Sequence, residues 1–211
     1  MDSVSGIGVL DKAVGVLDAL EGGPRSLPDL VAATGLPRAT AHRLAVALEA
    51  HGLVGRDGEG RFVLGPRLSL LSLPLLARPA LESLRETTGE SAQLYVRRGD
   101  RRLCVEALES PHGLRTIVPV GALLPLDRGS AGKVLRGDAA VLKRGWAESV
   151  EERERGVASV SAPVWENGSV VAAVSVSGPI ERTTRSPGRR YAKAVVAAAH
   201  AVERAMARPA P

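Results

Sequence analysis

The sequence predicts an α+β chain of two domains, a helical one that ends in a short hairpin and a larger one built on an antiparallel sheet. Before residue 50, apolar residues recur at helical spacing in three stretches separated by Gly and Pro. Two short apolar runs then flank a glycine-rich tip, and alternating runs dominate the second half. With 211 residues and 45% hydrophobic content, the chain can fill two modest cores. We place the domains at residues 1–66 and 77–211, joined by a linker at 67–76.

The first two helices are defined by their ends. Glycines and a proline at 22–24 end the first helix, whose apolar stripe is Val9, Leu10, Ala13, Val14, Leu17 and Leu20. Ser26 and Asp29 have the spacing of a capping box, which starts a second helix that runs to about Thr34. Gly35 follows as the turn.

A third helix is expected from Pro37 to about Ala50, because proline suits the first position of a helix and Gly52 stops it. One stripe of this helix is apolar: Ala41, Leu44, Ala45 and Leu48. Residues 53–56 and 61–64 predict two strands around the tip 57–60. Two helices, a glycine turn, a third helix and this hairpin make up a winged helix-turn-helix.

The second half reads as strands with a few helices. We expect a helix at 75–88, strands at 92–97, 102–108 and 114–120, and a short helix opened by residues 129–133. Strands at 157–164 and 170–177 follow, and the chain closes with a helix from about Pro187 to Met206 that Ser186 caps.

The turn between the last two strands decides which way their serines face. Asn167-Gly168 alone favours a two-residue turn, which would split the serines between the two faces of the sheet. A three-residue loop, Glu166 to Gly168, places Ser159 opposite Ser175 instead. Serines 159, 161, 175 and 177 then share one face and the neighbouring valines the other. We predict the three-residue loop, because a one-residue slip would bury hydroxyls among valines.

Charge and composition narrow the class of partner. The pI is about 10, yet residues 1–67 hold seven basic and eight acidic side chains. Five of those basic residues lie after Gly35, so the segment is positive toward its second half. Aromatic residues make up only 2% of the chain, which argues against the stacking surfaces of single-strand and RNA binders. Duplex DNA is the better candidate.

Other classes find little support. No apolar run approaches a membrane span, and the charged first helix excludes a signal peptide, so we expect a cytoplasmic protein. Cys104 lies in an alternating apolar run and has a packing role. The residues around Lys133 lack the full pattern of a phosphate loop or an acyl-transfer serine, and the four histidines are scattered. We therefore expect no enzyme, no cofactor and no metal.

The third helix carries the residues expected to read DNA. Short side chains on its exposed side allow it to enter the major groove, and Arg43 is the first candidate for a bidentate contact to guanine. Thr40 suits a phosphate, and Arg56 and Arg61 at the wing suit the backbone or minor groove. The complete set is Arg38, Ala39, Thr40, His42, Arg43, Arg56 and Arg61.

These segments resemble the IclR family of bacterial regulators. The resemblance rests on residues 35–44 (GLPRATAHRL), 48–54 (LEAHGLV) and 60–68 (GRFVLGPRL), and it continues at 88–95, 118–121, 129–133, 144–149 and 156–164. The later segments resemble the actinobacterial branch that controls leucine and other amino-acid biosynthesis genes. The resemblance implies a GAF-like effector domain and binding to palindromic operators as dimers or dimer pairs.

It also implies an effector site, carried over as Ser130, Ala131, Ser149, Ser159, Ser175 and Ser177. Hydroxyls and backbone amides at a helix start can receive a carboxylate, and small side chains leave room for it. Ser149 and Ser159 stand where relatives often have an acidic residue and a cysteine. Only residues 134–143 separate the 129–133 element from the 144–149 segment, a shorter stretch than in relatives, so the sheet domain is expected to be shortened.

Two functions therefore stay open. The first is a repressor or activator of amino-acid biosynthesis genes that responds to a small carboxylate or an amino acid. The second is a DNA-binding dimer whose shortened second domain serves only in oligomerisation. A GAF-type enzyme such as a sulfoxide reductase is disfavoured by the lone Cys104.

Overall fold

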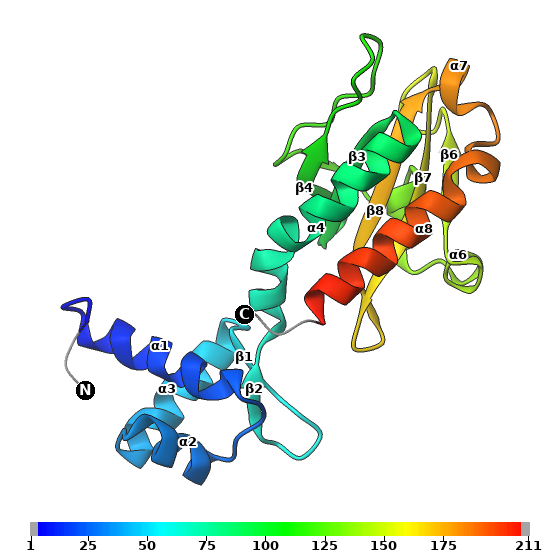
Figure 1. Cartoon of the computed structure of the whole chain (residues 1–211). Coiled ribbons are helices and arrows are strands. Elements are labelled where there is room, and N and C mark those ends of the chain that lie inside the picture. Colours follow the sequence, from blue (N-terminus) through cyan, green and yellow to red (C-terminus); the bar gives the residue numbers. More distant parts are fainter. Residues whose placement is uncertain (1–3, 208–211) are drawn as a thin grey trace. The chain divides into compact units, whose positions relative to one another are not determined.

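A computed structural model of the chain describes residues 4–207 (Figure 1). It divides into two compact units after Ser72, and each unit is described by itself. The division into a helical unit with a small hairpin and a larger sheet unit agrees with the predicted α+β class.

The first unit contains the three predicted helices and the hairpin. Helices α1 (Gly8–Glu21), α2 (Leu27–Thr34) and α3 (Arg38–Ala50) precede strands β1 (Val54–Arg56) and β2 (Phe62–Leu64). The strands pair antiparallel, and the backbone of Arg25 bonds to that of Phe62, which ties the segment before α2 to the wing. Their shared core consists of Val16, Leu20, Leu30, Leu36, Ala41, Ala45, Leu48, Val54 and Phe62.

The turn into α3 follows the predicted local chemistry. Ser26 and Asp29 form both hydrogen bonds of a capping box at the start of α2. Gly35 adopts the left-handed conformation (φ 66°) that ends α2, which glycine tolerates without strain. Pro37 is the residue that precedes the first turn of α3.

The expected start of the next helix is wrong. Helix α4 runs unbroken from Pro66 to Thr88, so the segment 67–76 is helical, and Pro74 and Pro79 lie inside the helix. Proline removes one backbone donor and disfavours helix. Here that cost is offset by an apolar stripe that continues past Pro74 at intervals of three or four residues and is buried, namely Leu73, Ala77, Leu81 and Leu84. The boundary between the two units falls within this helix.

The second unit is built on a six-stranded antiparallel sheet. Its order is β5-β4-β3-β8-β7-β6, and Figure 1 shows α4 and α8 on one face. The strands are β3 (Ser91–Arg98), β4 (Arg101–Leu108), β5 (Leu123–Pro125), β6 (Ala147–Val150), β7 (Val157–Glu166) and β8 (Ser169–Pro179). Strands β5 and β6 were not predicted, because each is only three or four residues long.

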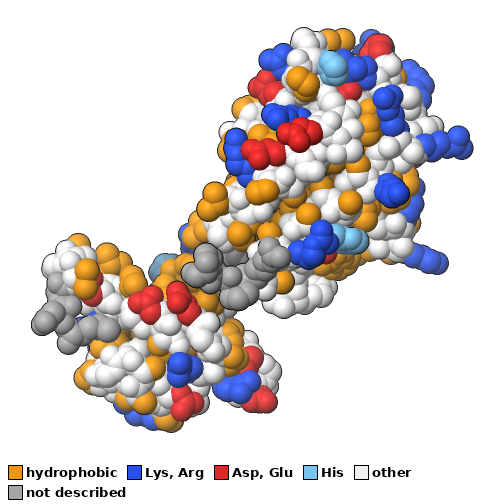
Figure 2. Space-filling model, in the orientation of Figure 1, with side chains coloured by type: hydrophobic (Ala, Val, Ile, Leu, Met, Phe, Trp, Pro, Cys, Tyr) orange, Lys and Arg blue, Asp and Glu red, His pale blue; other side chains and the backbone are white. Residues whose placement is uncertain are grey.

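Besides α4, this unit contains helices α5 (Ser130–Arg136), α6 (Ala139–Arg144), α7 (Ile180–Thr183) and α8 (Pro187–Met206). The bounds of α8 agree with the prediction, but the Ser186 side chain makes no capping hydrogen bond. Instead, a carboxylate oxygen of Glu148 accepts from the backbone N–H of Gly188 at 2.9 Å. Hydrophobic side chains gather over α4 and α8 on the surface in Figure 2. A shallow groove between the two helices is lined by Ala80, Ser83, Leu84, Thr87, Ala194, Ala197, Ala198 and Ala201.

The predicted strand at 114–120 is absent. This segment forms no ladder, and two of its carbonyls accept from side chains instead. Thr116 accepts from the Ser91 hydroxyl at 2.7 Å, and Leu114 accepts from Arg182 at 2.8 Å. Within this loop Thr116 and Val118 are buried, whereas Leu114, Ile117 and Val120 are exposed.

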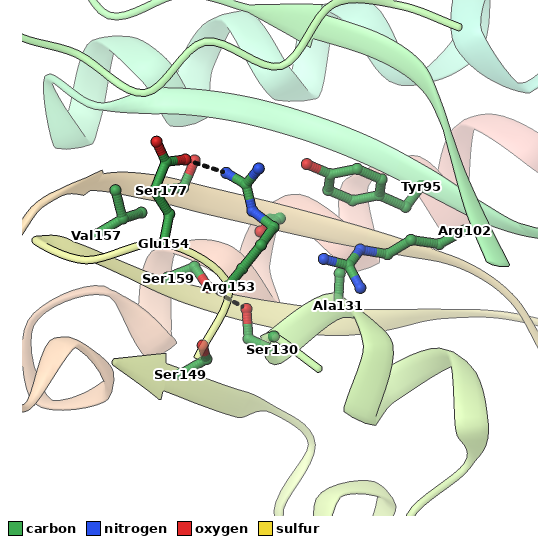
Figure 3. A pocket seen from close by; sticks show the side chains of 12 residues that line it. Tyr95, Arg102, Ser130, Ala131, Ser149, Arg153, Glu154, Val157, Ser159 and Ser177 are labelled. Atoms are coloured by element: carbon green, nitrogen blue, oxygen red, sulfur yellow. Dashed lines mark hydrogen bonds and ion pairs between the residues drawn. The ribbon is translucent and has the colours of Figure 1, made fainter. Parts of the chain in front are cut away.

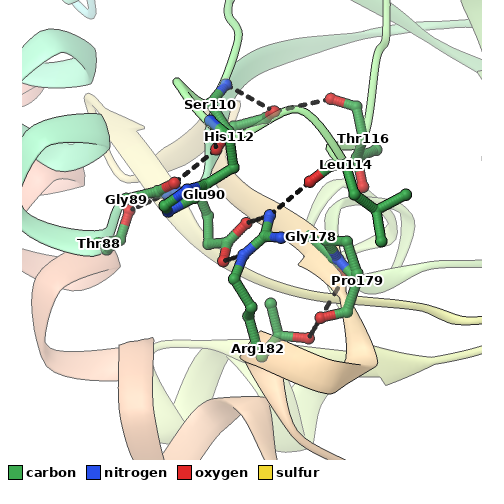
Figure 4. A network of polar contacts seen from close by, with 12 residues as sticks. Thr88, Gly89, Glu90, Ser110, His112, Leu114, Thr116, Gly178, Pro179 and Arg182 are labelled. Carbon is green, nitrogen blue, oxygen red and sulfur yellow. Dashed lines mark hydrogen bonds and ion pairs between the residues drawn. The ribbon is translucent and has the colours of Figure 1, made fainter.

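A buried ion pair anchors that loop to the sheet (Figure 4). The Glu90 carboxylate accepts from Arg182 through both oxygens, at 2.7 and 2.8 Å, and Glu90 is only 1% exposed. A Cβ on Gly178 would lie 2.3 Å from the Glu90 carboxylate, so only glycine fits there. The pair depends on this close approach of strand β8.

The hairpin β7–β8 has a different turn from the predicted one, but its serines still lie on one face of the sheet. The turn has two residues, Asn167 and Gly168, both at positive φ, as a type I′ turn requires, so the three-residue loop is wrong. A bulge next to Val164 then shifts the pairing by one residue and sets Ser159 opposite Ser177. The four serines therefore do share one face, although Ser175 pairs with Ser161 instead of Ser159.

Candidate functional site

The exposed side of α3 carries polar side chains that the protein itself leaves unused. Arg38, Ala39, His42 and Arg43 are exposed and Thr40 is half-buried, whereas Ala41 and Ala45 are fully buried against the core. Within residues 4–207, no side-chain hydrogen bond or ion pair involves any of these polar residues. Arg38, Ala39 and His42 also line a shallow hollow with Leu27 of α2. This face can offer its donors to an external ligand.

The two arginines of the wing are held in place by acidic neighbours. Arg56 pairs with Glu49 at 3.0 Å and lies over the Phe62 ring at 4.2 Å from its centroid. Arg61 pairs with Asp57 at 2.8 Å, and this contact raises the pKa of Arg61 and lowers that of Asp57, although burial of Asp57 opposes its shift. Both guanidinium groups are oriented beside the hairpin, and part of their charge is neutralised.

The second unit contains a small cavity on the serine face of the sheet (Figure 3). All six residues predicted for an effector site line it: Ser130, Ala131, Ser149, Ser159, Ser175 and Ser177. Each comes from an element that the sheet brings together, α5 for the first two and strands β6, β7 and β8 for the others. The register of the strands explains the grouping, because Ser149 pairs with Ser159 and Ser159 with Ser177.

The hydroxyls form a connected chain beneath the cavity. Ser130 Oγ lies 2.7 Å from Ser159 Oγ and 2.8 Å from Ser161 Oγ, and Ser161 donates to Ser175 at 2.9 Å. Ser177 donates to the Gln93 side-chain oxygen at 3.1 Å. Ser161 was not predicted as a site residue, but the alternation along β7 puts it on the same face as Ser159. These hydrogen bonds hold the hydroxyls in fixed orientations.

The start of α5 is bound to the segment that follows β6. The carboxylate of Glu152 already accepts from the backbone N–H of Gly129 at 2.9 Å. Lys133 donates to the same carboxylate and to the carbonyl of Glu148, which links α5 to the segment after β6. That segment supplies Arg153 and Glu154 to the lining, whereas no residue of α6 lines the cavity.

Sequence reasoning missed the charged part of the cavity. Tyr95, Arg102, Arg153 and Glu154 also line it. Arg102 is two residues from Cys104 on β4, so the alternation that predicts a buried Cys104 also turns Arg102 inward. Burial lowers the pKa of Arg102 and raises that of Tyr95. The alternation along β4 could have predicted that Arg102 points inward, but a charged side chain is not expected in a core.

Cys104 lies in the core, as predicted. It belongs to the cluster that includes Tyr95, Val134 and Ala173, and burial raises the pKa of its thiol to about 12. A thiol with that pKa carries almost no thiolate at neutral pH, so it is not a nucleophile. No group of three or more His, Cys, Asp or Glu side chains within the described residues could hold a metal ion.

A helix-turn-helix with a wing, together with a separate sheet domain that encloses a polar cavity, defines the class of two-domain DNA-binding regulators. The match to family models makes this specific. Residues 9–58 match the IclR helix-turn-helix domain, and residues 67–137 and 139–204 match the C-terminal domain of the bacterial transcriptional regulator IclR. The chain belongs to the IclR family of bacterial transcriptional regulators, which are DNA-binding proteins and not enzymes.

Relatives cover most of the chain. The glycerol operon regulatory protein of Streptomyces griseus is 33% identical over an alignment that covers 82% of this chain and 85% of that protein. The transcriptional repressor IclR of Escherichia coli is 25% identical, with coverage of 85% and 82%. A putative IclR-family regulator from Rhodococcus sp. has a similar structure, with TM-score 0.61, 27% identity and coverage of 97% and 96%. Within the described residues, no helix is long and apolar enough to cross a membrane.

Proposed function

We propose that this regulator binds a palindromic operator in duplex DNA as a homodimer or dimer of dimers in the cytoplasm, with α3 in the major groove and the wing on the adjacent backbone. The carrying observation is the exposed face of α3. Its guanidinium, imidazole and hydroxyl groups have no partner among the described residues, and its alanines allow close approach to the bases. Arg38, Thr40, His42 and Arg43 contact DNA in this proposal, with Arg56 and Arg61 on phosphates or the minor groove.

The homodimer has a face available on α1. Ile7, Val9, Leu10 and Val14 are 57%, 66%, 50% and 45% exposed, although the last three belong to the apolar stripe of the expected first helix. The core instead takes Val16 and Leu20 of this helix. Contiguous exposed apolar side chains mark a protein contact, and a second copy of the chain supplies it in this proposal, because a palindrome requires two copies of α3.

A small-molecule effector held in the serine-lined cavity controls DNA binding in this proposal. The cavity supports this reading over the alternative in which the second domain serves only in oligomerisation, since an oligomerisation domain has no need of a buried polar cavity with charged walls. A small carboxylate and an amino acid are the two effector classes implied by the resemblance.

The target genes are a separate part of the proposal. The resemblance described above favours amino-acid biosynthesis genes, leucine genes among them. The glycerol operon is a second candidate, since the regulator from S. griseus that is 33% identical carries that name.

Binding to DNA fragments selected from the organism's own genome tests the proposed operator, the number of chains bound to it and the target genes. The purified full-length protein is expected to enrich one palindromic sequence, and electrophoretic mobility shifts should give a site occupied by two or four chains. Enrichment of genes for amino-acid biosynthesis or for glycerol use identifies the pathway. Binding without any sequence preference would contradict the proposal.

A further inference from the structure

Arg102 is a buried cation at the edge of the cavity. It is 3% exposed, and its Nη1 donates to the carbonyl oxygens of Pro125 and Arg128, the latter at 2.6 Å. Gly129 leaves room for the guanidinium, because a Cβ there would lie 3.0 Å from Arg102 Nη2. At Gly132 the backbone oxygen of Leu126 would lie closer to a Cβ than Arg102 does.

No carboxylate neutralises this guanidinium. Among the described residues, Arg102 takes part in no ion pair, and its buried Nε has no hydrogen-bond acceptor. The guanidinium contacts neutral carbonyls, and the centroid of the Tyr95 ring is 5.5 Å away. Burial and the charges of Arg153 and Arg136 lower the guanidinium pKa, and Asp127, which lies beyond ion-pair distance, only partly offsets this. A buried charge without a counter-charge is costly, and proteins normally pair it. The missing partner is an anion, and Figure 3 shows the guanidinium turned toward the cavity.

The rest of the lining favours a negative ligand. Arg153 provides a second guanidinium, and Figure 3 shows it between Tyr95 and Ser159. The lining contains one carboxylate, Glu154, which lies 3.6 Å from Arg153 and has a side chain 63% exposed. The remaining polar groups are serine hydroxyls, which can donate to an oxyanion. A ligand ammonium would face two guanidinium groups and one carboxylate that is already paired.

The size of the cavity restricts the anion. Its volume is about 30 Å³, and about 10–15 Å³ by this measure holds one water molecule. The cavity therefore has room for about two or three water-sized groups, which limits a ligand to a small oxyanion. A larger ligand requires movement of residues 151–156, which Glu152 holds to Gly129 and Lys133.

We propose that Arg102 anchors a small oxyanion in this cavity, with Arg153 as the second cation, and that the site selects carboxylates or phosphate and excludes α-amino acids. The inference rests on the proposed function only in taking this cavity as the effector site. It names the chemistry that a ligand must have.

Isothermal titration of the full-length protein, in a buffer without phosphate or carboxylate, tests the selection. The probes are glycolate, pyruvate, inorganic phosphate and glycine. We expect at least one anion to bind, and glycine, which carries an ammonium where glycolate has a hydroxyl, to bind at least tenfold more weakly. Binding of phosphate alone assigns the site to a phosphate group, and binding of glycolate or pyruvate assigns it to a carboxylate. Equal binding of glycine, or no binding of any probe, overturns the proposal.

Arg102→Gln and Arg153→Gln test the residues, with Arg98→Gln as the control, since Arg98 is exposed on the neighbouring strand. Each of the first two variants is expected to weaken anion binding at least tenfold, and the control is expected to leave anion binding unchanged. Circular dichroism verifies folding. If Arg102→Gln fails to fold, the proposal is tested by the anion affinity of Arg153→Gln and by the ratio of glycolate to glycine affinity in the unmodified protein. Anion binding that persists in folded Arg102→Gln refutes the anchor. If the anion binds but leaves operator affinity unchanged, effector control fails while this inference stands.

Discussion

Replacement of Arg43 by alanine should remove sequence discrimination while leaving the protein intact. Arg43 is exposed on α3 and has no hydrogen bond or ion pair with the described residues, so its loss costs no internal contact. A bidentate contact to a base is worth about 1 to 3 kcal/mol, which corresponds to about a 5- to 150-fold change in affinity per half-site. The stability of the variant should stay within about 0.5 kcal/mol of the unmodified protein.

Arg56→Ala is the matched comparison, because Arg56 belongs to the same unit but points from the wing. Removing it breaks an exposed ion pair with Glu49 and the stacking on Phe62, at a cost of less than about 1.5 kcal/mol. If Arg56 contacts phosphates, all DNA sequences should lose affinity about equally. The log-log salt slope of the dimer, near −7 for about eight phosphate contacts, should become shallower by about 1.8.

Fluorescence anisotropy with operator and scrambled duplexes over a series of salt concentrations measures both effects. The ratio of specific to non-specific affinity should fall for Arg43→Ala and stay constant for Arg56→Ala. If Arg43→Ala leaves that ratio unchanged, α3 is not the recognition helix. An initial slope shallower than about −3 would also contradict the docking.

Three further predictions concern stability, assembly and reactivity. Gly178→Ala should lower the free energy of unfolding by about 2 to 4 kcal/mol in urea, since its Cβ would displace the buried Glu90 carboxylate; an unchanged midpoint would refute this. Leu10→Glu should convert dimers to monomers in analytical ultracentrifugation and weaken operator binding, and a variant that stays dimeric excludes the α1 face. Cys104 should resist iodoacetamide at pH 8 until the protein unfolds, because burial raises the pKa of its thiol to about 12. The raised pKa stabilises the folded protein fully below the ordinary pKa of 9.0, and this contribution is lost as the pH rises above that value. Modification of the folded protein would mean that the thiol is accessible.

The first unit was predictable because its signals are local. A capping box, a glycine in the left-handed conformation and a glycine-rich hairpin each act over a few residues, and all of them are present where expected. The local pattern could not show which apolar residues of α1 are buried. The period of its apolar residues marks an amphipathic helix, yet Val9, Leu10 and Val14 are exposed, because only contacts with other elements decide which apolar residues a core takes.

Helix α4 shows the opposite balance. Pro74 argues locally against a continuous helix, and the prediction followed it, although the expected helix at 75–88 already contained Pro79. The buried residues Leu73, Ala77 and Leu81 lie across Pro74 and make the helix continuous through their packing. Here tertiary contacts outweigh local preference.

The cavity depends on two register decisions that no single turn controls. Asn167-Gly168 alone would put Ser159 and Ser177 on opposite faces, and the bulge beside Val164 restores them to one face. The prediction reached the correct face through the wrong loop, because burial of hydroxyls among valines was the stronger constraint. The same logic applies to Arg102. Its parity on β4 turns it inward, and a second bulge, at the unpaired Val105 of β4, aligns Tyr95 with Cys104 on that face. An inward arginine with no ion pair is costly in a core, and this cost is the observation behind the proposal that Arg102 binds an anion.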